Sequence, residues 1–109
     1  MFKITDNPTF TRTVTIRVPA DGGYISETLT AVFNVLPVTE MNSFDLATEK
    51  GARAFLTAAI HSLDDIGDEN GKPLPYSDQL RDKVLDLPYA RAALAEEYTR
   101  SVEGAREGN

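Results

Sequence analysis

The chain has 109 residues, enough for one folded domain and too few for two. Its 11 basic and 17 acidic side chains give a net charge of −6, which disfavours binding to nucleic acid or anionic membranes by bulk charge. It has no cysteine, which excludes disulfides, thiolate catalysis and cysteine-ligated zinc, and no apolar run approaches the ~20 residues of a membrane-spanning helix.

The first third of the chain alternates between apolar and polar residues with the period of a β-strand. Over residues 9–18 the even positions are mostly apolar and the odd ones mostly threonine, which suits a strand with one buried face. Residues 19–23 interrupt it with proline, aspartate and two glycines, all turn formers. Over residues 25–36 mainly the odd positions are apolar. The two runs predict two strands joined by a tight turn.

A single antiparallel register satisfies both strands. It opposes three apolar pairs: Val18 with Ile25, Val14 with Leu29, and Phe10 with Phe33. This agreement predicts one β-hairpin over residues 9–36. Arg12 and Glu27 fall on the apolar face, where charges at a sheet edge discourage pairing with strands of other chains.

Beyond the hairpin the apolar spacing becomes helical. Thr39 is a candidate N-cap for a short first helix that reaches Ala47. Gly51 then separates this helix from a second one over residues 52–63, whose apolar residues are spaced three and four apart. This spacing predicts a helix with one broad apolar face.

The second half of the chain contains a loop and two further helices. Residues 64–75 are rich in acids, glycine and proline and predict the loop. Ser77 is a candidate N-cap for the third helix. Pro88 separates the third helix from the last, because proline is tolerated only in the first turn of a helix. One line of the last helix carries Ala90, Leu94, Tyr98 and Val102.

These elements predict one α+β domain covering residues 1–109. An isolated hairpin is unstable, so its apolar face must be covered, and helices are available to cover it. We expect the antiparallel hairpin of residues 9–36 to pack on three to four helices within residues 39–103. The polar residues 104–109 are expected to form a flexible tail.

The sequence offers little for catalysis. His61 is the only histidine, there is no cysteine to act as its partner, and no serine occupies a Gly-x-Ser-x-Gly turn. Gly22 and Gly23 lack the lysine and hydroxyl residue of a phosphate-binding loop. We therefore predict a protein that is not an enzyme, with no catalytic residues and no cofactor.

The acidic residues between 64 and 70 suggest a calcium loop, but their spacing does not fit one. An EF-hand loop needs oxygen ligands at its first, third and fifth positions and glycine at its sixth. With Gly71 as the sixth position, Ile66 occupies the first and has no side-chain oxygen; with Gly67 there, Ile66 occupies the fifth. The sequence therefore predicts no metal site, and Asn70-Gly71 is more typical of a solvated turn.

Apolar and aromatic residues in the last two helices and the preceding loop form a candidate binding surface. Such side chains serve either to complete the core under the hairpin or to form an apolar groove for another chain. The candidate partner-binding residues are Leu74, Tyr76, Leu80, Val84, Tyr89, Leu94 and Tyr98.

Residues 63–77 read LDDIGDENGKPLPYS and resemble an Asp-Glu-x-Gly-x-Pro-Leu-Pro-Phe-Ser pattern. The similarity continues through Leu-Asp-Leu-Pro at 85–88 and Ala-Ala-Leu-Ala-Glu-Glu-Tyr at 92–98. This order resembles that of tail assembly chaperones of long, flexible-tailed bacteriophages and prophages. His61-Ser62 departs from the Gly-Trp that these proteins often carry nearby.

The resemblance implies a non-catalytic role in the host bacterial cytoplasm. Such chaperones coat the apolar, helical tape measure protein until tail-tube subunits polymerise around it, and they are not expected in the mature virion. The resemblance also implies a second, longer form made by ribosomal frameshifting. Self-association into a homo-oligomer stays open.

Two alternative functions compete with the chaperone. One is a structural completion or connector protein of the virion tail. The other is a phage accessory protein that binds a host defence factor through charge complementarity.

Overall fold

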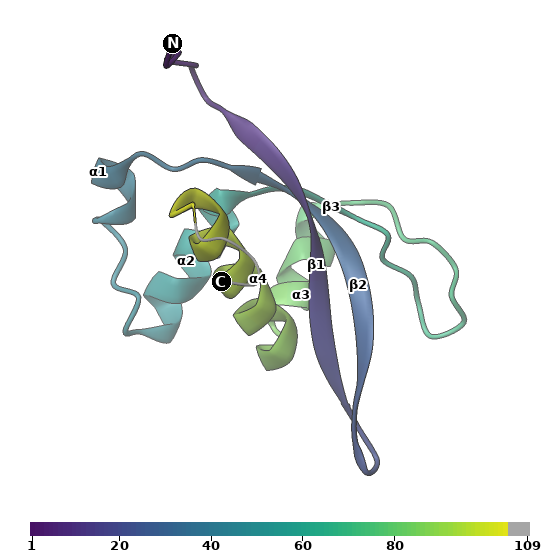
Figure 1. The fold of residues 1–109 in the computed structure, drawn as a ribbon. Coiled ribbons are helices and arrows are strands. Elements are labelled where there is room, and N and C mark those ends of the chain that lie inside the picture. The colour runs from purple at the N-terminus through teal and green to yellow at the C-terminus, as the bar shows by residue number, and fades with distance from the viewer. Residues whose placement is uncertain (105–109) are drawn as a thin grey trace.

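The computed structural model describes residues 1–104 and shows an α+β fold, as the sequence predicted (Figure 1). The predicted tail lies outside the described residues, apart from Gly104. A three-stranded antiparallel sheet in the order β1-β2-β3 carries the helices on one side. The elements are β1 (Thr9–Ala20), β2 (Gly23–Asn34), α1 (Val38–Met41), α2 (Glu49–Ala59), β3 (Ile60–Asp64), α3 (Asp78–Leu85) and α4 (Pro88–Val102).

The β1–β2 hairpin has the register that the apolar pattern predicted. All three apolar pairs are opposed: Val18 with Ile25, Val14 with Leu29, and Phe10 with Phe33. The tight turn is centred on Asp21 and Gly22, and Gly22 has a φ of +82°, which favours glycine. The turn projects beyond the helices, and the N-terminus lies at the opposite end of the hairpin (Figure 1).

The second predicted helix ends earlier than expected. It was expected to continue to residue 63, but α2 stops at Ala59 and Ile60–Asp64 forms β3. β3 pairs with Thr30–Phe33 of β2 and buries Ile60 and Leu63. Residues three apart lie on opposite faces of a regular strand, but a register shift between Val32 and Phe33 leaves His61 unpaired and allows both Ile60 and Leu63 to be buried. The same apolar spacing therefore suits a helix or an irregular strand, and the open edge of β2 decides between them.

The segment before α2 also differs from the expectation. The first helix is a single turn, α1, that begins at Val38 after Pro37, so Thr39 lies inside it and does not cap it, and it does not reach Ala47. Gly51 does not separate two helices but lies inside α2, because Thr48 caps that helix by accepting the Gly51 N–H at 3.0 Å. A Cβ on residue 51 would lie 1.9 Å from the carbonyl oxygen of Asp45, so this turn approaches the helix as closely as a glycine allows.

The predicted boundaries of the last two helices are confirmed. The Ser77 hydroxyl accepts the Leu80 N–H at 3.1 Å and caps α3, and α4 begins at Pro88. Three of the four residues on the predicted line of α4 are buried, whereas Val102 is 44% exposed.

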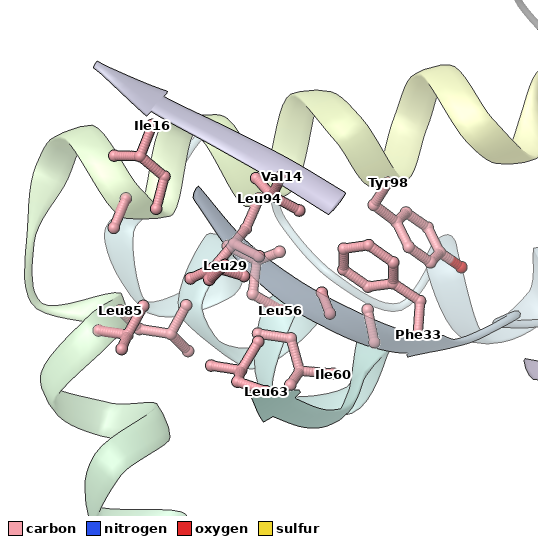
Figure 2. Close-up of a cluster of buried hydrophobic side chains, with 14 of the residues drawn as sticks. Val14, Ile16, Leu29, Phe33, Leu56, Ile60, Leu63, Leu85, Leu94 and Tyr98 are labelled. Atoms are coloured by element: carbon pink, nitrogen blue, oxygen red, sulfur yellow. The ribbon is translucent and has the colours of Figure 1, made fainter. Parts of the chain in front are cut away.

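The core lies between the sheet and the helices, with the ring of Tyr98 at one end (Figure 2). Tyr98 is 1% exposed, and its ring meets those of Phe33 and Phe55 edge-on at centroid distances of 5.4 and 5.3 Å. Its hydroxyl accepts the backbone N–H of Leu36 at 2.9 Å. Tyr98 therefore joins α4 to both the sheet and the chain that leaves it.

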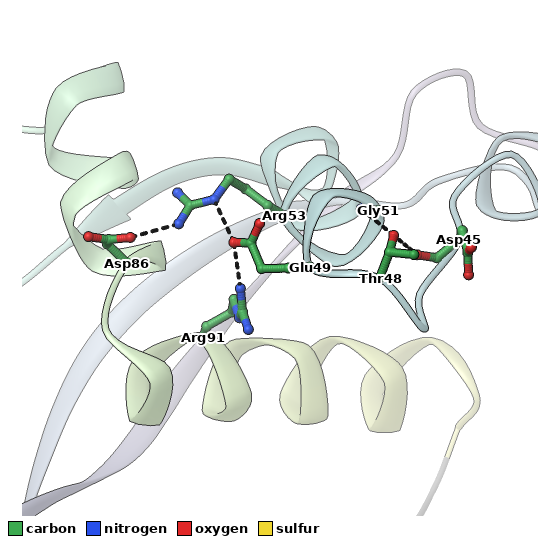
Figure 3. Close-up of polar contacts among 7 residues, drawn as sticks. All are labelled: Asp45, Thr48, Glu49, Gly51, Arg53, Asp86 and Arg91. Carbon is green, nitrogen blue, oxygen red and sulfur yellow. Dashed lines mark hydrogen bonds and ion pairs between the residues drawn. The ribbon is translucent and has the colours of Figure 1, made fainter.

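Two ion pairs connect α2 to the junction of α3 and α4, and a third lies within α2 and shares their residues (Figure 3). Arg53 contacts Glu49 at 3.3 Å and Asp86 at 2.9 Å, and Arg91 contacts Glu49 at 3.1 Å. The carboxylates of Glu49 and Asp86 are mostly exposed, so each ion pair adds little to stability.

We expect Tyr98→Phe to lower the free energy of unfolding by about 1–3 kcal/mol. The change keeps the ring but leaves the Leu36 N–H without its acceptor. Chemical denaturation of both proteins measures the loss. The control Tyr24→Phe removes an exposed hydroxyl and should change stability by less than about 0.5 kcal/mol. Equal effects of the two substitutions would contradict this role for Tyr98.

The effect of Tyr98→Phe should shrink at alkaline pH. Burial raises the pKa of Tyr98 above its usual value near 10, the Leu36 hydrogen bond opposes this shift, and the charge of Glu40 adds to it. Above pH ~10 the unfolded chain therefore loses this proton more readily than the folded chain, and stability falls as pH rises. Denaturation at pH 8 and pH 11 should show the difference between the two proteins narrowing.

We expect Gly51→Ala to destabilise the protein, although alanine normally favours a helix over glycine by ~1 kcal/mol. The added methyl group would clash with the Asp45 carbonyl, and overpacking of this kind costs about 1–3 kcal/mol. Thermal unfolding measures the change. The neighbouring Lys50→Ala, on an exposed helical position, is the control and should be nearly neutral. A stabilised Gly51→Ala protein would show that no close approach exists.

Candidate partner-binding site

The structure divides the seven candidate partner-binding residues into two groups. Leu94 is 0% and Tyr98 1% exposed, because their line of α4 faces the sheet. Because they are buried, neither Leu94 nor Tyr98 can contact a partner of the folded chain, and the prediction is wrong for these two residues. Leu80 and Val84 are also buried, each 8% exposed. The three residues that remain half-buried at the surface are Leu74, Tyr76 and Tyr89.

The fold brings two of the candidates, Val84 and Tyr89, into one groove. This apolar groove has a volume of about 220 Å³ and lies between the distal half of the hairpin, the start of the β3–α3 loop and the α3–α4 junction. Its lining residues are Ile16, Val18, Glu27, Thr28, Leu29, Asp65, Ile66, Gly67, Val84, Leu87, Tyr89 and Ala90. The groove combines residues from four elements that are far apart in the sequence.

Sequence reasoning missed most of the residues that line the apolar groove. Leu87 is 42% exposed at the N-cap position of α4, next to the proline that separates the last two helices, and it was not among the candidates. Val18 was assigned to the hairpin alone, and Ile25, opposite it on the same face, is half exposed. The signal that could have indicated this groove is the apolar alternation of the hairpin, which continues to Val18 and Ile25, beyond the part that the helices cover.

The size of the apolar groove favours a protein ligand over a small molecule. Pockets for small molecules usually enclose about 300–1,000 Å³, more than this groove provides. A groove of this volume suits one or two apolar side chains projecting from a partner. Its rim carries Glu27 and Asp65 and no lysine or arginine, which favours a partner with basic residues beside the apolar ones.

Asp65 shapes one rim of the apolar groove. It has a φ of +60°, an uncommon conformation for a residue with a side chain, and its carboxylate accepts the Thr30 hydroxyl at 2.6 Å. This bond joins the loop that follows β3 to the middle of β2. The position of Ile66, the next residue in the loop, therefore depends on the sheet.

In the acidic loop after β3, the Asp68 carboxylate accepts hydrogen bonds from the backbone of the same loop. Asp68 Oδ1 accepts the N–H groups of Asn70 and Lys72, both at 2.9 Å, and Gly67 pairs with Pro73 in an isolated bridge. Gly71 supplies the positive φ of +79°. This geometry is that of a closed turn in which the Asp68 oxygen is already occupied.

Within residues 1–104, no three acidic or histidine side chains group closely enough to hold a metal ion. His61 is exposed on β3. No helix in the same range is both long enough and apolar enough to span a bilayer.

We expect Asp68→Ala to lower stability by about 1 kcal/mol, because two backbone N–H groups lose their acceptor. The effect should be the same with calcium or with a chelator. Thermal unfolding under both conditions tests this, and the neighbouring exposed Glu69→Ala serves as the control. A calcium-dependent rise in Tm of the unsubstituted protein would contradict the closed-turn interpretation.

Comparison with known proteins provides no relative for this chain. No protein-family model matches it, and neither curated proteins nor solved structures give a match. The resemblance carried by residues 63–77 therefore stays a prediction, and the interpretation of the apolar groove rests on the residues that line it.

Proposed function

We propose that this chain is a non-catalytic tail assembly chaperone that holds the phage tape measure protein soluble in the host cytoplasm until tail-tube subunits polymerise around it. The observation that carries the proposal is the apolar groove with its acidic rim. The resemblance of residues 63–77 to such chaperones supports the choice of client.

The apolar groove suits an amphipathic helix. A helix presents a ridge of side chains at spacings of three and four, and helix-in-groove recognition inserts one or two of them into an apolar hollow. Val18 from the hairpin and Leu87 and Tyr89 from the α3–α4 junction line this hollow. Burying one leucine of the client in this way is worth roughly 1.5–3 kcal/mol.

Weak binding at each site is enough for a long client. A tape measure protein repeats its apolar stripe along several turns of helix, so many chaperone copies can bind one chain. A contact between neighbouring copies would add to each through effective concentration. The net charge of −6 per copy also keeps a coated client from aggregating.

Co-expression with the tape measure protein tests the proposal through Leu87→Ser. Leu87 occupies the N-cap position of α4 with extended backbone, where serine is favoured, so the substitution preserves the helix while removing an apolar wall. We expect about tenfold weaker client binding at each site and a smaller soluble client fraction. The matched control is Leu46→Ser, because Leu46 is similarly exposed and does not line the apolar groove.

Two outcomes would contradict the proposal. One is a client that is equally insoluble with and without this chain. The other is a fixed copy number of the chain in purified virions, measured by mass spectrometry, which would favour a tail connector instead.

A further inference from the structure

The outer edge of β1 carries no neighbouring strand among the described residues. The Val35 N–H donates to the Pro8 carbonyl at 2.9 Å, so even-numbered residues of β1 direct their backbone groups toward β2. In an antiparallel ladder the odd-numbered residues then direct theirs outward. Thr9, Thr11, Thr13 and Thr15 therefore direct their N–H and carbonyl groups away from β2, and the Thr11 carbonyl accepts a hydrogen bond from the Arg12 side chain. Pro19, which lacks an N–H, also occupies an odd position, where the ladder to β2 needs none.

A groove runs along this open edge. It has a volume of about 680 Å³, with β1 on one side and α4 on the other, and we call it the edge groove. α4 runs antiparallel to β1, since Tyr98 lies beside Phe10 and Ala90 lies near Ile16. The α4 wall of the edge groove carries Tyr89, Ala92, Ala93, Glu96, Glu97 and Arg100. One face of a strand added to β1 would therefore pack against this α4 wall.

The chain itself contains a segment suited to this position. Residues 1–6 precede β1, and Phe2 and Ile4 are 92% and 91% exposed. They alternate with Lys3 and Thr5, the pattern of a strand with one apolar face. No hydrogen bond or ion pair joins these six residues to the rest of the described chain. Asn7 has a φ of +51°, so the chain changes direction between these six residues and β1.

We propose that residues 1–6 of one copy add to β1 of a second copy as an antiparallel strand in the edge groove. One register opposes apolar residues to apolar residues and an acid to a base on the face toward α4. On the face toward α4, Phe2 lies opposite Ile16, Ile4 opposite Val14, and Asp6 opposite Arg12; on the outer face, Thr5 lies opposite Thr13. This inference concerns self-association and does not depend on the identity of the client.

Charge selects this register among the alternatives. Arg12 lies on the apolar face of β1, where it contacts the Phe10 ring and the Thr11 carbonyl but no carboxylate. An antiparallel strand with an acid at this place gains an opposite-charge pair. A parallel strand that kept Ile4 opposite Val14 would place Asp6 against Ile16. Arg12 thus opposes most added strands and accepts one that carries a correctly spaced acid.

The same chain cannot supply its own residues 1–6 in this register. Pairing Asp6 with Arg12 of one chain would require residues 7–11 to form the turn, but Thr9 to Thr11 are already paired with β2. A two-residue turn at positions 7 and 8 would instead oppose Lys3 to Arg12 and direct Phe2 and Ile4 to the outer face. The occupant is therefore a second copy. Exchange in one direction forms rings or filaments, and reciprocal exchange forms dimers.

Charge reversal tests the pairing in the full-length chain. Sedimentation velocity over a concentration series should show self-association that weakens about three- to tenfold in Asp6→Arg and in Arg12→Asp. The double variant restores the opposite charges and should recover association. Glu69→Arg, which makes the same charge change as Asp6→Arg in the exposed loop, is the control and should have no effect.

Hydrogen exchange distinguishes strand addition from other contacts. The amides of Thr11, Thr13 and Thr15 face solvent in the single copy and should become protected as concentration rises. Thr13→Pro removes one outward N–H without removing a bond to β2, and should abolish association while the hairpin persists. A protein that stays monomeric at all concentrations, or that associates without protecting these amides or regardless of charge at positions 6 and 12, would overturn the proposal.

Discussion

The packing of α4 against the apolar face of the β1–β2 hairpin is the constraint on which the rest of the structure depends. A two-stranded hairpin needs a covered face to be stable, and α4 covers it with Ala90, Leu94 and Tyr98. Tyr98 contributes most, because its ring closes one end of the core and its hydroxyl satisfies a backbone N–H that leaves the sheet. The apolar groove and the edge groove are the parts of the hairpin that this packing leaves uncovered.

Two features remain uncovered for different reasons. The hairpin is longer than the helices beneath it, so its distal apolar positions form the apolar groove with the α3–α4 junction. Within residues 1–104 no strand lies outside β1, so its outer backbone groups face the edge groove. The first feature presents apolar side chains and suits a helix. The second presents hydrogen-bonding groups and suits a strand.

The two grooves meet at one residue. Tyr89, in the first turn of α4, lines both of them. It follows Pro88, the residue at which α4 begins. A partner helix in the apolar groove and an added strand in the edge groove would thus both lie beside Tyr89.

Local pattern alone determined the hairpin register, the Ser77 cap and the break at Pro88, because strand alternation, capping and proline geometry each depend on neighbours in sequence. Tertiary structure decided the rest. Ile60 and Leu63 became a strand because β2 had an unpaired edge beside them, and Leu94 and Tyr98 became core because α4 turned that line toward the sheet. The apolar groove was beyond reach of the sequence for the same reason: Val18, Ile66 and Leu87 carry no shared spacing, and only packing brings them together.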